Sequence, residues 1–185
     1  MIGVQDLRKG VTVEIDGEIY VVVDYSHLKP ARGPAIIRTK MRNLRTGATV
    51  DQTFGSGGKV QDIRLDHSTV QYLYSDGDLY HFMDTETYEQ PVLSASTLGD
   101  AVNYLTENLV IKLESYEGEP INVELPTTVD LDVTQTEPGF AGDTATGAMK
   151  DAIVSTGLKV KVPLFINEGD VIRVDTRDGS YVTRV

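Results

Sequence analysis

The chain has 185 residues, 40% of them apolar and none of them cysteine, with a formal net charge of −11. The missing cysteine excludes disulfides and thiolate metal sites, and the length is typical of one to three small domains. No run approaches the roughly 18 apolar residues of a membrane span, and the first residues lack a signal segment. We therefore expect a cytoplasmic protein that does not contact a membrane.

The charge is unevenly distributed along the chain. Residues 1–64 hold 10 basic and 7 acidic side chains, residues 65–128 hold one basic and 12 acidic, and residues 129–185 hold 6 and 9. This division favours a first part that approaches phosphate and a middle that avoids it. An acidic surface that only keeps the protein dispersed would explain the middle equally well.

Short alternating β-rich segments dominate the chain. Residues 11–15 and 19–23 flank the pair Asp16-Gly17, which is a strong hairpin signal because glycine supplies the positive φ of a tight turn. Further turns of this kind stand at Arg45-Thr46-Gly47, Asp76-Gly77, Glu117-Gly118 and Asp178-Gly179. Evenly spaced short hairpins favour small β-barrels over one wide sheet.

One segment, residues 97–108, has a helical pattern, with Asp100 as its expected N-cap. Residues 138–156 are rich in Gly, Thr and Ala and are interpreted as one long loop. Breaks between the strand groups predict an all-β protein of three small barrels. The expected domains are 1–64, 65–128 and 129–185.

No active site is visible in the sequence. The three histidines share no metal-ligand spacing. Residues 55–59 resemble a phosphate loop, but Val60 stands where that loop needs Ser or Thr, so we interpret them as a connection between strands. We therefore expect no catalytic residue, no metal site and no cofactor, and a protein that is not an enzyme.

A loop bracketed by two prolines joins strands expected at residues 19–25 and 35–42. Each proline fixes its own φ near −65° and pushes the preceding residue toward extended backbone. Two stiff arms therefore flank a short tip that carries Arg32, whose guanidinium can pair with phosphate or stack on a base. The loop consists of Lys29, Pro30, Ala31, Arg32, Gly33 and Pro34.

The strand after this loop carries Arg38, Lys40 and Arg42 at period two, so all three face the same way. They could bind three phosphates, or they could be the solvated face of an edge strand that discourages sheet pairing. The edge-strand interpretation does not explain an arginine at a proline-bracketed tip. The pattern favours nucleic acid binding without indicating which kind.

Several motifs together resemble one family over the length of the chain. They include DLRKG (6–10), KMRNLRTG (40–47), KDAIVSTGLKVKVPLFINEG (150–169) and VIRVDTRDGSYVTR (171–184). The sequence is similar to bacterial elongation factor P. The resemblance implies an N-terminal SH3-like, KOW-type barrel followed by two OB-fold barrels, in an L-shaped arrangement like transfer RNA.

The resemblance also implies a function. Members bind both ribosomal subunits between the peptidyl and exit sites, and stimulate peptide-bond formation at stalled polyproline sequences by positioning peptidyl-tRNA. They act as translation factors and not as enzymes, and a monomer is expected. The implied partners are the ribosome, peptidyl-tRNA and exit-site mRNA.

The resemblance assigns roles to residues of this chain. Arg32 stands at the tip position, which faces the CCA end of peptidyl-tRNA and which an enzyme modifies in many members. Lysine is commoner there, and Ala31 and Pro34 also depart from the usual loop, so we expect Arg32 to be unmodified or glycosylated. Further implied RNA contacts are Gly142, Asp143 and Thr144 near exit-site mRNA, and Tyr181 and Arg184 against peptidyl-tRNA.

Three other functions fit part of the pattern. An elongation-factor-P-like paralogue shares the three-barrel plan and often has arginine at the tip. A general OB-fold protein that binds single strands would need basic residues among its aromatics, and residues 65–128 have one basic residue, Lys112. An enzyme would need a convergent site.

Overall fold

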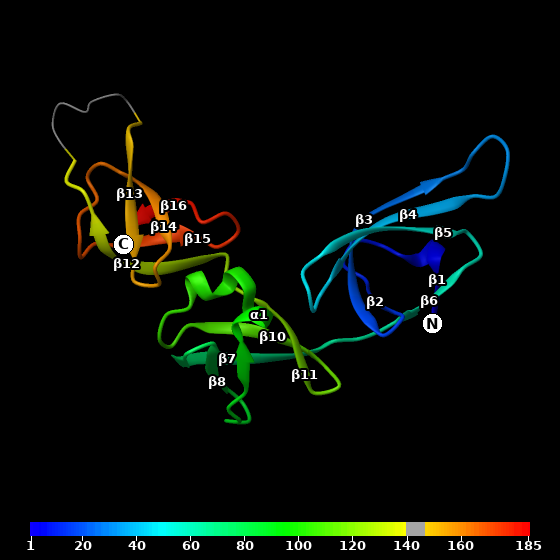
Figure 1. Ribbon diagram of the computed structural model, residues 1–185, viewed down its shortest axis with the longest axis horizontal. Helices are drawn as coiled ribbons and strands as arrows, with labels where there is room; N and C mark the ends of the chain where they lie inside the picture. The colour runs from blue at the N-terminus through cyan, green and yellow to red at the C-terminus, as the bar shows by residue number, and fades with distance from the viewer. Residues whose placement is uncertain (140–146) are drawn as a thin grey trace. The chain divides into compact units, whose positions relative to one another are not determined.

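The computed structural model describes residues 1–139 and 147–185. Within them the chain forms three β-sheets and only short helical segments (Figure 1). This confirms the all-β prediction. By internal contacts the chain divides into two compact units. The first unit comprises residues 1–67 with 114–122, and the second comprises residues 68–113 with 123–185.

The first sheet has the strand order β1-β6-β2-β3-β4-β5. The strands are β1 (Ile2–Gly3), β2 (Thr12–Ile15), β3 (Glu18–Leu28), β4 (Ile36–Asn43), β5 (Thr49–Gly55) and β6 (Lys59–Asp62), with a 3₁₀ turn at Val4–Asp6. The predicted hairpin between β2 and β3 is present. Its two turn residues, Asp16 and Gly17, have φ of 53° and 81°, the left-handed values that such a turn requires.

Apolar side chains from five elements pack together to form the core of the first sheet. Along β4, buried and exposed residues alternate, so Ile37 and Met41 point inward and are fully buried. This is the period-two pattern of a strand with one face on a core. The cluster consists of Val4, Leu7, Val13, Val22, Ile37, Met41 and Val60.

The second sheet has the order β11-β10-β7-β8-β9. Its strands are β7 (Asp66–Asp76), β8 (Leu79–Asp84), β9 (Val92–Ser94), β10 (Val110–Tyr116) and β11 (Glu119–Glu124). The predicted turns are present, with Gly77 at φ 61° between β7 and β8 and Glu117 and Gly118 at 50° and 80° between β10 and β11. Its core includes Val70, Phe82, Leu93 and Ile111.

The third sheet has the order β14-β13-β12-β15-β16. Its strands are β12 (Thr128–Thr136), β13 (Met149–Val154), β14 (Lys159–Pro163), β15 (Val171–Asp175) and β16 (Tyr181–Arg184). Its core is rich in valine and isoleucine, including Val162, Ile166 and Ile172. Branched side chains suit this setting because they pack well on a pleated surface.

Two sequence expectations were wrong in detail. The helix predicted over residues 97–108 is a four-residue helix α1 (Ala95–Leu98) followed by a 3₁₀ helix, Gly99–Tyr104. Ser94, not Asp100, caps α1, since its Oγ accepts a hydrogen bond from the Thr97 amide at 3.3 Å. Gly99 ends the α-helical turn by adopting φ 55°, which glycine tolerates without a Cβ clash.

The long loop predicted over residues 138–156 is also shorter than expected, because β13 (Met149–Val154) lies within it. Asp151 on this strand is opposite Lys161 on β14, and Ala152 and Val154 are buried. β13 pairs on one side with β12 and on the other with β14. These long-range contacts stabilise the strand although residues 150–152, KDA, have a weak local strand propensity.

Tyr104 attaches the helical segment to the core of the third sheet. It is 7% exposed and belongs to the core of the third sheet, and burial is the main cause that raises its pKa. Nearby, Thr156 Oγ1 donates to the carbonyl of Asn103 at 2.6 Å. Leu109 and Leu125 pack against the cores of both sheets. The segment therefore connects the second and third sheets.

In the described part of the chain, no helix is both long and apolar enough to cross a membrane.

Candidate nucleic-acid interface

The loop with Arg32 lies at the end of the β3–β4 hairpin, which extends beyond the rest of its sheet (Figure 1). β3 runs further toward the loop than the sequence predicted, since Leu28 still pairs with Ile36. β4 is also paired with β5 up to Ile36 and Gly55, and Ser56 donates its amide proton to the carbonyl of Ala35 at 3.0 Å. Three strands therefore support the root of the loop.

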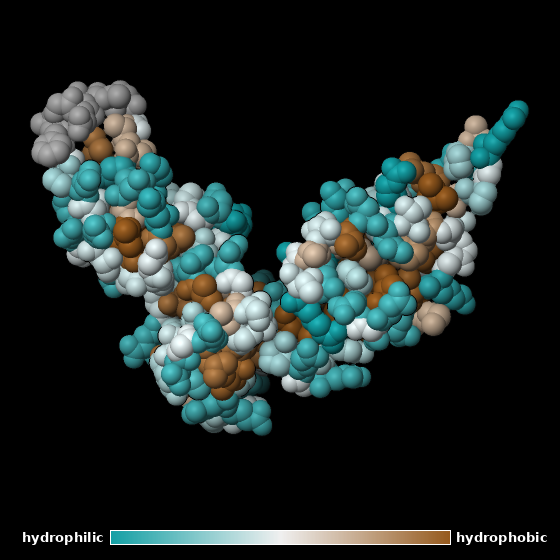
Figure 2. Space-filling view, viewed as in Figure 1, coloured by the Kyte–Doolittle hydropathy of each residue, from teal (hydrophilic) through white to brown (hydrophobic). Residues whose placement is uncertain are grey.

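Every residue of the loop from Lys29 to Pro34 is exposed, including Arg32. The tip surface is hydrophilic in Figure 2. Among the described residues, the Arg32 side chain makes no ion pair and no hydrogen bond. Its guanidinium is therefore available to a ligand. Gly33 adopts φ 110° and not the ordinary extended conformation expected before a proline. L-residues with a side chain rarely adopt this φ.

Arg38, Lys40 and Arg42 lie on one exposed face of β4, as their spacing predicted. The edge-strand interpretation is wrong, because β4 lies between β3 and β5 and is not an edge. A strand paired on both sides needs no charge to prevent sheet pairing. Polar side chains are ordinary on a strand face that meets solvent, and binding an anionic ligand stays a prediction for these three cations.

The acidic neighbours of this row are few. Across the sheet, Lys40 is opposite Asp24 on one side and Asp51 on the other, which lowers its contribution to the local potential. Arg38 is opposite Ser26 and Thr53, and Arg42 is opposite Val21 and Thr49. Arg38 thus retains more of its positive potential, whereas Arg42 lines a pocket that also includes Glu114.

Arg8 is a residue at the base of the hairpin that sequence reasoning missed. Its guanidinium carbon lies 5.0 Å from the centre of the Tyr25 ring on β3, within the range of a cation–π contact. Its Nη1 donates to the carbonyls of Leu7 and Gln5 at 2.6 and 2.8 Å. Arg8 therefore links the turn before β2 to the lower part of the hairpin. Only its place in DLRKG singled it out in the sequence.

The third sheet carries the other predicted RNA contacts. Tyr181 on β16 is partly buried against the core of that sheet, so one part of its ring is occupied by packing. The side chain of Arg184 is 52% exposed. Gly142, Asp143 and Thr144 lie outside the described residues. Phe165, beside Arg184, was missed by sequence reasoning and is 56% exposed.

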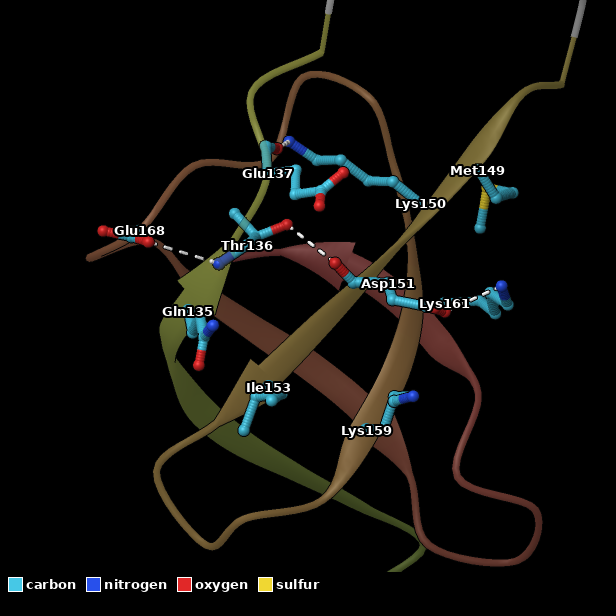
Figure 3. Close-up of a pocket in the computed structure, with 10 residues that line it drawn as sticks. All are labelled: Gln135, Thr136, Glu137, Met149, Lys150, Asp151, Ile153, Lys159, Lys161 and Glu168. Carbon is cyan, nitrogen blue, oxygen red and sulfur yellow. Dashed lines mark hydrogen bonds and ion pairs between the residues drawn. The ribbon is translucent and has the colours of Figure 1, made fainter.

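An open groove of about 540 Å³ lies across β12, β13 and β14 (Figure 3). Its lining carries as many carboxylates as lysines: Glu137, Asp151 and Glu168 against Lys150, Lys159 and Lys161. The Nζ of Lys161 is 2.7 Å from Asp151, which lowers the pKa of that carboxyl group, and Lys150 donates to the carbonyl of Glu137 at 2.5 Å. The groove therefore lacks the net positive charge that phosphate binding requires. The described residues include no cluster of metal-ligating side chains.

Three family models match successive parts of this chain. They are the elongation factor P KOW-like domain over residues 3–60, the elongation factor P OB domain over residues 65–123, and the elongation factor P C-terminal domain over residues 129–184. Curated relatives named "Elongation factor P" match over its whole length. The relative from Thermoanaerobacter sp. (strain X514) is 52% identical over 185 residues, and that from Acetivibrio thermocellus is 51% identical, each covering 100% of both chains.

The chain belongs to the elongation factor P family. It is therefore a translation elongation factor.

Solved structures agree with the multi-barrel fold. The chain is similar to a eukaryotic translation initiation factor 5A from Methanococcus jannaschii, with a TM-score of 0.54 and 24% identity over 68% of this chain and 90% of that chain. An initiation factor 5A family protein from Naegleria fowleri gives a TM-score of 0.50 at 14% identity. At these identities the likeness concerns the fold alone. With the KOW-like and OB matches, it confirms the predicted fold class.

Membership of the elongation factor P family leaves the roles of single residues open. Arg32, the row on β4, Tyr181 and Arg184 stay predictions, as do the domain boundaries after residues 64 and 128. The structure does bring the tip and the row together on one hairpin of the first unit.

Proposed function

We propose that this elongation factor binds the ribosome between the peptidyl and exit sites and stimulates peptide-bond formation at stalled polyproline sequences. The observation that carries the proposal is the exposed Arg32, which forms no ion pair with another described residue, at the end of a hairpin whose root is supported by three strands. Its partners are both ribosomal subunits and peptidyl-tRNA, with exit-site mRNA as a further contact. According to this proposal, the tip of the hairpin reaches the CCA end of peptidyl-tRNA.

The proposed mechanism is positional. Proline is a constrained nucleophile and also restricts the nascent chain, so the reacting ends spend little time in reactive geometry. A tip that holds the CCA end in place converts binding energy into orientation, an effect that can remove several kcal/mol of a barrier. The factor makes and breaks no bond itself, and the ribosome supplies the reaction centre.

The stiffness of the hairpin supports this mechanism. Pro30 and Pro34 restrict the backbone on either side of the tip, and strand pairing continues to Leu28 and Ile36. A loop that is ordered before binding loses less conformational entropy when it binds. More of the interaction with peptidyl-tRNA then remains available to orient it.

The charge distribution also supports the proposal. The basic row Arg38, Lys40 and Arg42 lies behind the tip on an exposed strand face, where it can contact backbone phosphates. Residues 65–128 carry 12 acidic side chains and one basic side chain. Such a segment favours contact with basic protein over contact with RNA. Arg32 acts either unmodified or glycosylated by an enzyme that recognises the tip.

Reconstituted translation of a Pro-Pro-Pro reporter tests the proposal. We expect the wild-type chain to relieve the stall, and Arg32→Ala to lower the stimulated rate by about tenfold or more, since the tip contact acts in the transition state. Arg64→Ala is the matched control, because Arg64 is another exposed arginine of the first unit that lies off the hairpin. It should behave as wild type.

Two results contradict the proposal in different ways. If wild type leaves the stall unchanged while binding RNA without preference, the chain is a general OB-fold RNA-binding protein. If wild type relieves the stall and Arg32→Ala does so equally well, the function stands and the role of the tip is wrong.

A further inference from the structure

Arg184 ends β16 next to an exposed aromatic ring. Its guanidinium carbon lies 5.4 Å from the centre of the Phe165 ring, a distance at which the positive charge interacts with the ring face. Phe165 is 56% exposed, although phenylalanine is ordinarily buried. The two residues are 19 positions apart and lie on different elements, so tertiary structure brings them together.

The Arg184 guanidinium has two recorded neighbours, the Phe165 ring and the carboxylate of Asp170. The nearest carboxylate oxygen in the described residues is Asp170 Oδ2, at 4.0 Å, which is too far for a hydrogen bond. That same oxygen accepts a hydrogen bond from the Asn167 amide at 2.8 Å. The contact with Asp170 is therefore a long ion pair, and the Arg184 side chain, 52% exposed, keeps N–H groups that a ligand can reach.

The turn that carries Phe165 is held firmly by its backbone. Ile166, the next residue, is fully buried, and its amide donates to the carbonyl of Pro163 at 3.2 Å. The backbone of Gly139 also packs closely against Leu164, the residue before Phe165. A Cβ at position 139 would lie 2.5 Å from the carbonyl oxygen of Leu164. The backbone position of Phe165 is thus fixed, although the ring itself is more than half exposed.

We propose that Phe165 is a positioning residue that holds the Arg184 guanidinium in place for binding RNA. The inference rests on the proposed function and on the predicted contact of Arg184 with peptidyl-tRNA. The guanidinium carbon lies over the ring at 5.4 Å, and the exposed N–H groups can pair with a phosphate in the bidentate manner of arginine. An arginine oriented in advance loses fewer rotamers when the RNA binds.

A double-mutant cycle on the full chain tests this inference, with affinity for ribosomes that carry peptidyl-tRNA as the readout. We expect Phe165→Leu to weaken binding by about threefold to tenfold. Arg184→Gln should weaken it at least as much, and the double variant no more than Arg184→Gln alone. Phe165→Tyr keeps an aromatic face and should restore wild-type affinity.

Controls separate positioning from folding. Val182→Ala removes another exposed apolar side chain of β16, 49% exposed, and should leave the affinity unchanged. Thermal unfolding of Phe165→Leu should match wild type, because an exposed ring contributes little to the core. The slope of log affinity against log salt should fall by about one for Arg184→Gln and stay constant for Phe165→Leu, which keeps the charge.

The outcomes distinguish this inference from the proposed function. If Phe165→Leu binds as well as wild type, or weakens binding equally in the Arg184→Gln background, the ring does not act through Arg184 and the inference is overturned. If wild type itself does not bind these ribosomes, the proposed function fails and the inference falls with it.

Discussion

Asp175 shows how a single residue can stabilise a turn. It lies at the end of β15, where Arg177 folds back on it with Nη2 2.7 Å from Oδ2 and with its backbone amide 2.8 Å from Oδ1. These bonds favour the ionised carboxylate, and they lower the pKa of Asp175 from its ordinary 3.8 to about 2. The turn between β15 and β16 is therefore coupled to the charge of this side chain.

We predict that Asp175→Asn weakens the acid sensitivity of the fold. Because the folded pKa is lowered, this carboxylate contributes stability that is fully present above about pH 4 and is lost as the pH falls toward 2. The asparagine variant should lose less free energy of unfolding over that interval than wild type does, as measured by urea denaturation at several pH values. Arg177→Ala should reduce the acid dependence in part, and an unchanged dependence in Asp175→Asn would contradict the assignment.

At the scale of one element, β4 combines a functional face and a structural face. Arg38, Lys40 and Arg42 face solvent, whereas Thr39 on the other face is 1% exposed. The Oγ1 of Thr39 donates to the carbonyl of Gln52 on β5 at 2.9 Å. This buried hydrogen bond helps to hold the middle of the hairpin against β5.

We predict that Thr39→Val destabilises the first unit by about 1 kcal/mol, because valine keeps the shape but loses the buried hydrogen bond. The free energy of unfolding in urea measures the effect. Thr49→Val is the matched control, since Thr49 begins β5 with its side chain exposed, and it should change stability by less than about 0.5 kcal/mol. Equal losses in the two variants would show that the hydrogen bond is not the cause.

At the scale of the whole molecule, the separation of charge predicts how ribosome binding depends on salt. Residues 1–64 carry a net positive charge and residues 65–128 a net negative one. If the row on β4 binds three phosphates, replacing Arg38, Lys40 and Arg42 with glutamine should lower the slope of log affinity against log salt by about 2–3.

Lys9→Gln/Lys59→Gln/Arg64→Gln is the matched control for this experiment. These three residues are exposed, carry the same total charge and lie in the first unit away from the β3–β4 hairpin. The control should lower the slope by less than one. An equal fall in both triple variants would indicate that total charge, and not the row, governs binding.

Local chemistry explains most of what could be predicted. The Asp-Gly and Glu-Gly turns have the positive φ values that their residues suggested, and the period of β4 placed three cations on one face. The helix prediction over residues 97–108 was wrong because Gly99 interrupts it and Tyr104 packs into the third core. The β13 strand was missed because its stability comes from two neighbouring strands.

The sequence by itself determined the all-β class, the hairpins and a proline-bracketed arginine, because turn geometry, strand period and proline φ depend on residues only a few positions apart. Only the tertiary structure decided that β4 is paired on both sides, that Tyr181 is partly buried and that Phe165 lies against Arg184. These features depend on contacts between residues far apart in the chain, and no local pattern encodes which partner a strand or a side chain will find.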